Sequence, residues 1–516
     1  MAKVFWLSVK EDTPARAYWD QRLLEELFEA EDHEVVKAIP NCSEAIVIIP
    51  GAYQGDSLDK INEELSHIEK VTVIVTSDEE NKFPLDDLSH NNMRVFANYY
   101  NPKFKSDIHW FPIGPANTFP SELVEKDKNW AFLGQVTHPK REIYVKELRK
   151  RDDGYLKETN GFAQGLEPEE YYKVLQTAKV VPSPEGNVCP DAFRTYEAIC
   201  AGAVPIPVDV EWHEAVFGGV PFPVVSDYEQ VNGYIDDALA QYPTLNNDVQ
   251  VWWLHYKKFL KDQILGERKK IVTAIIPCSP IKSHPDTSII DETIQSINTN
   301  LPGVEIIVTF DGVREEQKDR AKAYEEFKRR FLWKCYNDPT YKNVLPLIFK
   351  EHSHQVKMAR EALRWVRSDI VLYVEQDTPL VTDEKIDWKK CFDFIKNGEA
   401  NLIRFHFESE IPHVHNHLML GKPENGFQRT FQWSQRPHLI SVPYFENILD
   451  KNFTEDAICF IEDKMHGVVQ NEVLTHGMSA WYQHRIWIYH PDGNIKRSYH
   501  TDGRAGGEKW DDTQTW

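Results

Sequence analysis

Short apolar segments alternate with amphipathic segments from the start of the chain. The apolar segments have the β-branched and aromatic composition of strands: KVFWLSV, EAIVIIPGAY, VTVIVTS, MRVFANYY and IHWFPIGP. Between several of them, AYWDQRLLEELFEAED and DSLDKINEELSHIEK have the apolar spacing of helices. This strand–helix–strand order is typical of a parallel, doubly wound sheet. We therefore predict a Rossmann-like lobe over residues 1–120.

The alternation begins again at WAFLGQV, residues 130–136. It continues through two helical segments to the strand VVPSP, the helix FRTYEAICAG and the strand VPIPV, and a helical stretch over residues 228–268 follows. This order predicts a second Rossmann-like lobe with a helical linker over residues 121–267. Ligands of such sheets bind at the carboxyl ends of the strands, so two tandem lobes predict a cleft between them.

The pattern starts a third time after the helical stretch. The strand KKIVTAIIPCS, the helix SIIDETIQSINTN and the strand VEIIVTFDG follow each other in the same βαβ order. A fresh start after a helical linker predicts a domain boundary near residue 268. We expect a separate α/β domain over residues 268–516.

Composition limits the cellular setting of the protein. No apolar run approaches the ~20 residues of a membrane span. The first apolar segment soon meets Lys10, Glu11 and Asp12, which is typical of a strand and not of a signal peptide. The seven cysteines form no C-x-x-C pair, which favours a reducing compartment over a disulfide scaffold or a structural zinc site. We expect a cytoplasmic protein without a membrane span.

The net charge of −22 argues against a surface that grips nucleic acid broadly, because phosphate binding requires a positive footprint. A basic groove confined to one part of the chain remains compatible with this charge. An anionic substrate would therefore need a local positive site or a bridging cation.

Two carboxylates end the apolar strand in SDIVLYVEQDTPL. Glu375 and Asp377 stand two residues apart, so at a strand end they point to the same side. Carboxylate oxygens in this arrangement suit a divalent cation that neutralises a departing diphosphate. A solvated strand end is the alternative interpretation.

The segments around this strand resemble the GT-A glycosyltransferases, close to the family-2-like group. The resemblance rests on IVTAIIPCSPIKSHPDTSIIDETIQSINTNLPGVEIIVTFDGV and on KMAREALRWVRSDIVLYVEQDTPL, which match an opening strand, a strand ending in Asp-Gly, an Ala-Arg helix and a D-x-D strand end. The family usually has Asp where this chain has Glu375. Either Asp377 alone holds the metal, or the site is looser.

The resemblance implies roles for further residues of this domain. Asp311 would lie near the nucleoside base or ribose, and Pro277 and Ser279 would line the same pocket. Arg360, on the helix KMAREALRW, would face the nucleotide. An ordinary surface charge is the alternative for Arg360.

The acidic pair in CFIEDKM supplies a candidate general base. An inverting transfer requires a group that takes the proton from the acceptor hydroxyl. In family-2-like enzymes this pair commonly supplies the base, so the resemblance implies Asp463 as the base and Glu462 as its neighbour. The alternative is a pair of helix-start acids favoured by the helix dipole.

The C-terminal stretch IKRSYHTDGRAGGEKW carries a late histidine. The resemblance implies that His500 completes a site for Mn²⁺ or Mg²⁺ with Asp377 and Glu375. The glycines of this stretch predict a lid over the donor, with a frayed terminus as the alternative. Cations that would meet phosphates are Lys496, Arg497 and Arg504.

The stretch RFHFESEIPHVHNHLMLG contains alternating histidines. On a strand, His413, His415 and His417 would share one face, which suits either a metal cluster or, more commonly, an acceptor surface. The aromatic residues of GFQRTFQWSQRPHLIS would suit stacking on sugar rings or bases: Phe427, Phe431 and Trp433.

The N-terminal half contains KVVPSPEGNVCPDAFRTYEAICAGAVPIPVD, which resembles the donor-binding region of GT-B glycosyltransferases, especially the exostosin-like group. Pro184 and Gly186 would form a turn before a helix whose N-terminus offers free N–H groups to a diphosphate. Arg194 would add a charge-assisted bond to phosphate. Glu197, one turn later, would hold a ribose hydroxyl.

The segment FLGQVTHPKRE supplies a second expected phosphate contact in this half, from Gly134 after a strand and from His138, Lys140 and Arg141 just before a helix. No metal is expected in a GT-B-like module, because positive side chains and helix dipoles take that role. The alternative is a plain Rossmann-like domain whose loops need Gly and Pro for their turns.

These patterns predict an α/β glycosyltransferase with a GT-B-like module followed by a GT-A-like module. The expected donor is a UDP-sugar or a similar nucleotide-sugar, and the expected acceptor is a glycan or glycoconjugate. Two transfer sites in one chain are predicted, the C-terminal one metal-dependent and inverting. The alternatives are a transferase acting on modified bases of DNA, as in some viruses, and a chain in which one module only binds.

Overall fold

A computed structural model describes residues 3–7, 21–28, 32–50, 58–79, 82–99, 108–161, 164–186, 188–266 and 270–501. The chain forms two compact units, Met1–Glu267 (unit 1) and Arg268–Trp516 (unit 2). Both contain parallel strands connected by helices, which confirms the predicted α/β class. No helix in the described part of the chain combines the length and the apolar character needed to cross a membrane.

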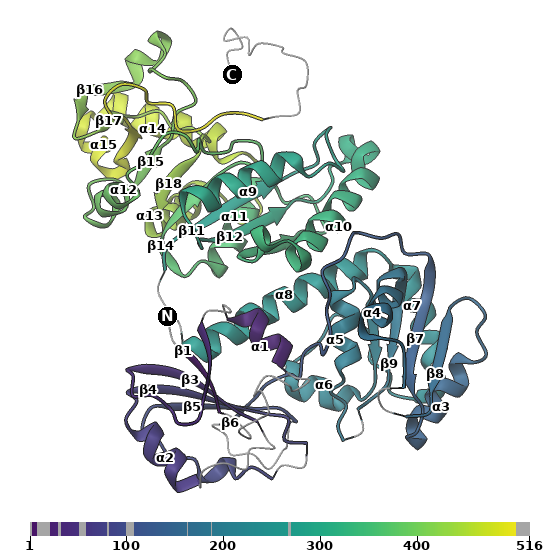
Figure 1. Ribbon diagram of the computed structural model, residues 1–516. Coiled ribbons are helices and arrows are strands. Elements are labelled where there is room, and N and C mark those ends of the chain that lie inside the picture. Colours follow the sequence, from purple (N-terminus) through teal and green to yellow (C-terminus); the bar gives the residue numbers. More distant parts are fainter. Residues whose placement is uncertain are drawn as a thin grey trace. The chain divides into compact units, whose positions relative to one another are not determined.

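The described N-terminal part of unit 1 forms a six-stranded sheet in the order β2-β1-β3-β4-β5-β6 (Figure 1). All neighbouring strands are parallel. The central strands β3 and β4 are buried along almost their whole length, as a parallel sheet covered on both faces requires. The elements are β1 (Lys3–Leu7), α1 (Arg22–Leu27), β2 (His33–Val36), β3 (Glu44–Pro50), α2 (Leu58–Ser66), β4 (Lys70–Thr76), β5 (Met93–Ala97) and β6 (Ile108–Trp110).

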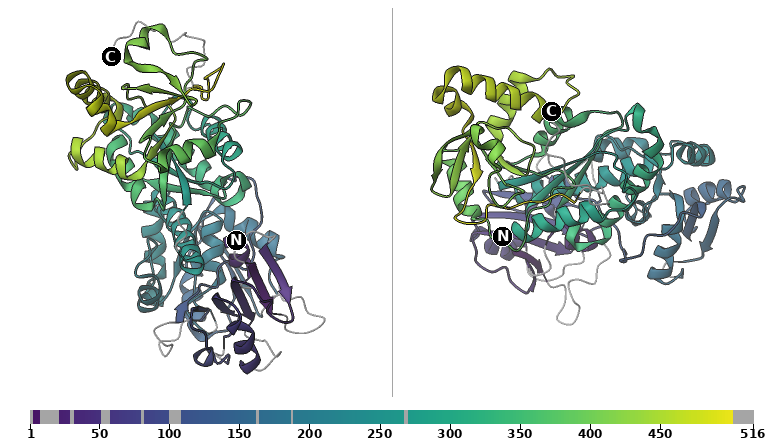
Figure 2. Two further views of the ribbon diagram at one scale, coloured as in Figure 1. Left: turned by 90° about the vertical axis from the view of Figure 1, so that its left-hand side faces the viewer. Right: turned by 90° about the horizontal axis from the view of Figure 1, so that it is seen from above.

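The second part of unit 1 has its own four-stranded parallel sheet, in the order β10-β9-β7-β8 within the described residues. It is separate from the first sheet and has its own helices (Figure 1, Figure 2). The elements are β7 (Lys128–Gln135), α3 (Pro139–Leu148), β8 (Tyr155–Thr159), α4 (Pro168–Thr177), β9 (Ala178–Ser183), α5 (Phe193–Cys200), β10 (Val204–Pro207), α6 (Val210–Phe217), α7 (Val231–Gln241) and α8 (Thr244–Leu265).

Helix α8 connects the second lobe back to the first sheet. The carbonyl groups of its last turn accept hydrogen bonds from that sheet: Thr72 Oγ1 donates to Ile264 O over 2.9 Å and Arg94 Nη1 to Gln263 O over 2.9 Å. These donors satisfy carbonyl groups that a helix end leaves without partners. The two lobes of unit 1 are therefore joined by polar contacts as well as by the chain.

Unit 2 is built on one sheet, whose nine described strands follow the order β13-β12-β11-β14-β18-β15-β19-β17-β16 (Figure 1). The first four are parallel, and β18 runs antiparallel to β14 and β15. The elements are β11 (Lys270–Cys278), α9 (Ser288–Asn300), β12 (Glu305–Phe310), α10 (Ala321–Asn337), β13 (Val344–Ile348), α11 (His354–Trp365), β14 (Ser368–Tyr373), α12 (Trp388–Lys396), β15 (Leu402–Arg404), β16 (Met419–Glu424), β17 (Phe427–Thr430), β18 (His438–Ser441), α13 (Val442–Asn452), α14 (Ile461–His476), α15 (Met478–His484) and β19 (Ile486–Tyr489).

Candidate functional site

Unit 1 contains a cavity of about 460 Å³. Its walls come from the carboxyl ends of strands in both sheets: Glu79 follows β4 and Tyr99 follows β5, while Gly134 is the last residue but one of β7 and Pro184 follows β9. Parallel α/β sheets bind ligands at this edge, because the loops that follow the strands converge there. The cavity is therefore a candidate ligand site.

The N-terminal candidates from the sequence meet in this cavity, with one exception. Pro184, Gly186, Gly134, Arg194 and Glu197 all line it. Lys140 is not among the lining residues, and its Nζ lies 3.4 Å from Glu185 Oε1. Arg141, which the sequence offered in the same stretch, does line the cavity.

Arg194 is held at the start of α5. Its Nη2 donates to Leu133 O over 2.7 Å, and the guanidinium lies 4.6 Å from the centre of the Phe132 ring. Its Nε is buried and has no hydrogen-bond partner among the described residues. A Cβ at Gly134 would overlap Arg194 Nη2 and lie 3.2 Å from Arg194 Cζ. The absence of a side chain at Gly134 is therefore what admits the guanidinium.

A second buried cation, Arg141, lies near Arg194. Arg141 is 8 % exposed, and its Nε donates to Glu185 O over 2.8 Å. Burial, followed by the charge of Arg194, lowers the pKa of Arg141 to about 10. The Glu185 carboxylate opposes this effect. Arg141 and Arg194 both line the cavity, and two cations at one wall favour an anionic ligand there.

The N-terminus of α5 opens on the same cavity. Ala192 and Phe193 line it, and the helix has no side-chain cap at this end. The first N–H groups of a helix without such a cap are available to an anion, and the helix dipole favours negative charge there. Helix α5 and the two arginines thus make the cavity a candidate site for an anion.

Two buried carboxyl groups fix the loop after β6 against α5. Glu197 Oε1 accepts a hydrogen bond from Asn117 N over 3.1 Å, and Asp191 Oδ2 accepts one from Ile113 N over 3.2 Å. Burial raises the pKa of Glu197, and it raises that of Asp191 to about 7. Both groups are engaged by backbone donors, so their first role is to shape the cavity wall.

In unit 2, the C-terminal segment runs antiparallel to the turn after β14. Tyr499 N donates to Pro379 O over 3.1 Å, and Thr501 N donates to Asp377 O over 2.8 Å. This pairing brings His500 Nδ1 to 3.9 Å from Asp377 Oδ2. Two of the predicted metal ligands, more than a hundred residues apart in sequence, are therefore neighbours.

Glu375 is tied to the start of α14 by two glutamines. Its Oε1 accepts from Gln355 Nε2 over 2.7 Å, and Gln355 Oε1 accepts from Gln435 Nε2 and from Ile461 N, both over 3.2 Å. Gln435 N donates to Glu462 Oε2 over 3.0 Å. Desolvation and then the Asp377 carboxylate raise the pKa of Glu375 to about 8.

The fit of a divalent cation depends on these contacts. Among the described residues, no three His, Cys, Asp or Glu side chains come together in a geometry that would hold a metal ion. Asp377 and His500 supply an oxygen and a nitrogen donor, whereas Glu375 is bonded to Gln355. Mg²⁺ is often held by one or two carboxylates with water and substrate phosphates completing its shell. The Asp377–His500 pair fits that kind of site.

The nucleoside candidates of unit 2 have structural partners. Asp311 Oδ1 accepts from Ser353 N over 2.6 Å, and Asp311 Oδ2 lies 2.8 Å from His352 Nδ1, so the carboxylate caps the start of α11. Arg360 Nη2 donates to Leu449 O over 2.8 Å at the end of α13. Arg360 is thus engaged by helix-end carbonyl groups, which follows from the carbonyls a helix leaves unpaired at its C-terminus.

The remaining candidates of unit 2 lie at the end of β11 and at the start of α14. Pro277 is buried within β11, and the half-buried Ser279 accepts a hydrogen bond at its carbonyl oxygen from Gln376 Nε2 over 3.2 Å. Asp463 is exposed in the first turn of α14, one residue after Glu462. Ile461 N donates to Gln355 Oε1 over 3.2 Å, so the start of α14 lies beside the start of α11.

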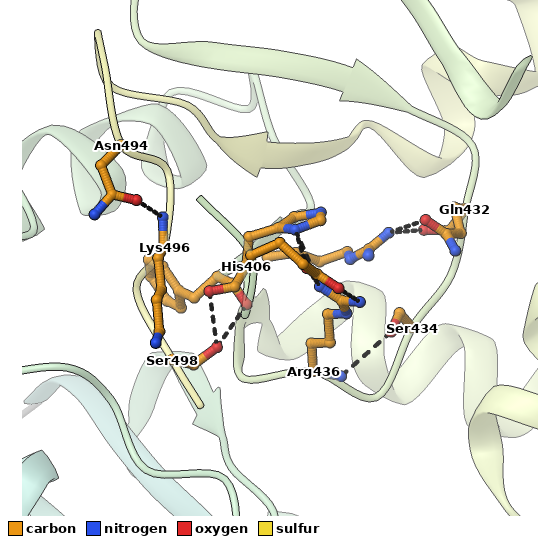
Figure 3. A network of polar contacts seen from close by, with 10 residues as sticks. His406, Gln432, Ser434, Arg436, Asn494, Lys496 and Ser498 are labelled. Carbon is orange, nitrogen blue, oxygen red and sulfur yellow. Dashed lines mark hydrogen bonds and ion pairs between the residues drawn. The ribbon is translucent and has the colours of Figure 1, made fainter. Parts of the chain in front are cut away.

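The sequence did not single out a polar network around the end of β15 (Figure 3). Arg436 pairs with both carboxylate oxygens of Glu408, and His406 Nδ1 lies 2.7 Å from Glu408 Oε2. Ser498 of the C-terminal segment donates to His406 O over 3.2 Å. The sequence signal for this network is the alternation of Arg404, His406 and Glu408 in RFHFESE. Its meaning becomes clear only in the folded chain, where Arg436 and Ser498 supply the partners.

Several C-terminal expectations require correction. Phe427, Phe431 and Trp433 are buried in the core of unit 2 and present no face for stacking. His413, His415 and His417 lie in a 3₁₀ turn that begins after Pro412, so they do not share the face of a strand. Arg497 is 4 % exposed and donates to Asn494 O and Lys496 O. Arg504 and the glycines of the predicted lid lie outside the described residues.

Comparison with known proteins gives no family assignment. No family model and no curated protein matches the chain. Among solved structures, S. aureus TarS 1–349 aligns at 14% identity over 45% of this chain and 60% of that chain, with a TM-score of 0.29. The same fragment with UDP-GlcNAc aligns at 13% identity over 45% of this chain and 58% of that chain, with a TM-score of 0.27.

A mannosyltransferase from Pyrobaculum calidifontis, PcManGT in complex with GDP-Man and Mn²⁺, aligns at 13% identity over 49% of this chain and 67% of that chain, with a TM-score of 0.29. The present chain therefore spans about three fifths of the TarS fragment and two thirds of PcManGT. The solved structures that align include a glycosyltransferase, and TM-scores this low assign neither fold nor function to this chain.

Proposed function

We propose that this protein is a glycosyltransferase that moves a sugar from a nucleotide-sugar to a glycan or glycoconjugate acceptor. One observation carries the proposal: the unit 1 cavity gathers Arg141, Arg194 and the uncapped N-terminus of α5 at the carboxyl ends of parallel strands. Cations and free N–H groups so arranged match the diphosphate of a nucleotide-sugar.

In unit 1 the protein itself would stabilise the departing diphosphate. As the bond between the sugar and the diphosphate breaks, negative charge grows on the phosphate oxygens. The Arg194 guanidinium is already oriented by its contacts with Leu133 O and the Phe132 ring, and the helix itself fixes the direction of the first N–H groups of α5. Preorganised donors of this kind stabilise a transition state without a cost of reorganisation. No metal is needed for this step.

A second transfer site in unit 2 is supported by the pairing of the C-terminal segment with residues 377–381. Asp377 and His500 would hold Mn²⁺ or Mg²⁺, whose chemistry is to neutralise the leaving diphosphate. Asp463, exposed at the start of α14, would take the proton of the acceptor hydroxyl in an inverting reaction. Gln355 and Gln435, which connect Glu375 to Glu462, would hold the metal side and the base side of this site at a fixed distance.

A binding experiment on the full chain tests the proposal. UDP-glucose, UDP-GlcNAc and GDP-mannose are each titrated while the thermal unfolding temperature is followed, because a ligand that binds the folded state stabilises it by mass action. We expect one donor to raise the unfolding temperature of the wild type and of Arg149→Ala, whose exposed guanidinium lies outside the cavity. The shift should fall in Arg194→Ala. Absence of any donor shift in the wild type would refute the proposal.

Two alternative functions predict different results for donor turnover and for DNA binding. If one module only binds, that module would bind the donor but would not turn it over. A transferase for DNA bases would bind DNA with a steep salt dependence. The burial of Phe431 and Trp433 removes the feature that favoured DNA, so the glycan acceptor is the better supported.

A further inference from the structure

The first lobe of unit 1 presents a constrained pair of strand ends to the cavity. Ser77 directly follows β4 and Tyr99 follows β5, and both have φ of 56°, in the left-handed region. Residues with a side chain seldom adopt this conformation, and it persists where surrounding contacts enforce it. Asn98 provides such contacts, because its Oδ1 accepts from Ser77 N over 3.2 Å and its Nδ2 donates to Phe111 O over 2.9 Å.

This arrangement gives two consecutive acids different roles. Asp78 is buried, and its carboxylate accepts from Lys82 N over 2.8 Å and from Phe83 N over 2.9 Å, so it closes its own loop. Glu79 is exposed and lines the cavity. Tyr99, 8 % exposed, donates from its hydroxyl to Glu79 Oε1 over 3.3 Å. The tyrosine therefore orients a carboxylate that remains open to a ligand.

Glu79 lines the same cavity as groups of the second lobe. Cys189, which also lines the cavity, has a pKa raised to about 12 by burial, by Asp191 and, to a smaller extent, by Glu79. Cys189 belongs to the loop between β9 and α5, the same loop that carries Gly186. The carboxylate of the first lobe and the phosphate-binding features of the second lobe therefore lie within reach of one ligand.

The other acids of the cavity are less suited to act on a substrate. Asp191 accepts from Tyr196 OH over 2.6 Å and from Ile113 N, and Glu197 accepts from Asn117 N. Both are buried. Glu167 is exposed and lines the cavity, and it stands at the start of α4 in the second lobe, on the side of the arginines. Glu79 is thus the exposed lining acid of the first lobe among the described residues.

We propose that Glu79 is the general base of the transfer reaction in unit 1, and that Tyr99 is the residue that positions it. The proposal rests on the proposed function of this cavity as a nucleotide-sugar site. The acceptor hydroxyl gives its proton to Glu79 while its oxygen bonds to the anomeric carbon of the sugar. The bond from that carbon to the diphosphate breaks, and its electron pair leaves with the nucleoside diphosphate. The products are a glycoside, a nucleoside diphosphate and a protonated Glu79.

The test uses full-length chain carrying Asp377→Asn, which removes a contribution from the second transfer site. Release of nucleoside diphosphate from UDP-glucose, UDP-GlcNAc and GDP-mannose is measured with water as the acceptor, and donor binding is measured by thermal shift. We expect Glu79→Gln to lower kcat at least about 100-fold, the usual range for a general base, with KM and the donor shift unchanged. Tyr99→Phe should lower kcat about tenfold, also without a change in KM, and Glu79→Asp should restore part of the loss.

Two further variants decide between acids. Glu69 is exposed and directly precedes β4, at the end of the strand away from the cavity. The control variant Glu69→Gln should have the kcat and KM of the parent. A larger loss in Glu167→Gln than in Glu79→Gln would overturn the assignment, as would loss of the donor shift in Glu79→Gln, which would mark a structural role. Undiminished turnover in Glu79→Gln would overturn it while leaving the proposed function intact. Absence of any donor shift in the parent would instead refute the site itself, and the base with it.

Discussion

Gly134 allows a sharp test of the phosphate site, because its lack of a side chain is what admits Arg194. In Gly134→Ala, the new methyl group would overlap Arg194 Nη2 and approach Cζ to 3.2 Å. The arginine end is flexible, so the chain should still fold with the guanidinium displaced. The displaced group loses its bond to Leu133 O, 2.7 Å long, and its position over Phe132.

The magnitude follows from the contacts that are lost. A hydrogen bond from a charged donor contributes about 1.5–3 kcal/mol. If Arg194 makes one such bond to the diphosphate, Gly134→Ala should weaken donor binding about 10- to 150-fold. The same substitution should destabilise the protein by a similar amount, because the bond to Leu133 is also lost.

A double-mutant cycle with Arg194→Ala identifies the cause. Once the arginine is removed, the nearest remaining contact of the new methyl group is Phe132 Cζ at 3.7 Å, an ordinary van der Waals distance. Gly134→Ala should then leave donor affinity unchanged and raise stability by about 0.5–1 kcal/mol through the unfolded state. The sign of its effect on stability should therefore reverse between the two backgrounds.

The assay compares four proteins: the parent, each single variant and the double variant, all with Asp377→Asn. Donor affinity is measured by titration calorimetry and stability by scanning calorimetry of the full chain. Residues in contact show strong coupling in such cycles, whereas independent sites add. Equal, additive losses from Gly134→Ala in both backgrounds would refute the clash with Arg194 as the mechanism.

Three further predictions concern groups elsewhere in the chain. Burial raises the pKa of Asp191 to about 7, so its stabilising contribution is complete below the unfolded pKa of about 3.9 and is lost as the pH rises towards 7. Asp191→Asn should therefore unfold at a higher temperature than the wild type at pH 8 and at a similar one at pH 4; parallel pH profiles would contradict this. Gln355→Met leaves Glu375 Oε1 and Ile461 N without their partner, and we expect a loss of about 1–3 kcal/mol in urea unfolding, with the exposed Gln483→Met unchanged. Mn²⁺ added with a donor should raise the unfolding temperature of the wild type more than that of Asp377→Asn or His500→Ala; equal shifts would rule out this pair as ligands.

Local pattern predicted much of the architecture. Apolar runs such as Ile370–Leu372, buried on both faces, identify central strands of a sheet whose two faces are both covered. The residues of the proposed phosphate site around α5 are also close in sequence. The spacing of Pro184, Gly186 and Arg194 places a turn just before the start of a helix. Local structure within one lobe is therefore enough to bring these three residues to the same cavity.

Other features depended on segments that meet only in the folded chain. Glu79 and Tyr99 occur in unremarkable loop sequences, and the sheet order brings β4 and β5 together so that their loops form one wall. Asp311 has the sequence position of a nucleoside ligand, yet the start of α11 uses its carboxylate. Phe427, Phe431 and Trp433 resembled a stacking surface, yet the core of unit 2 buries them.

By itself, the sequence determined the α/β class, the turn before α5 and most strands and helices, but not the strands β2 and β8. These depend on side-chain periodicity and on backbone rules that act over a few residues. Tertiary structure decided which polar groups remain available to a ligand. A carboxylate or guanidinium must satisfy its hydrogen bonds once buried, so only the fold determines whether its partner is a helix end, as for Arg360, or an open cavity, as for Glu79.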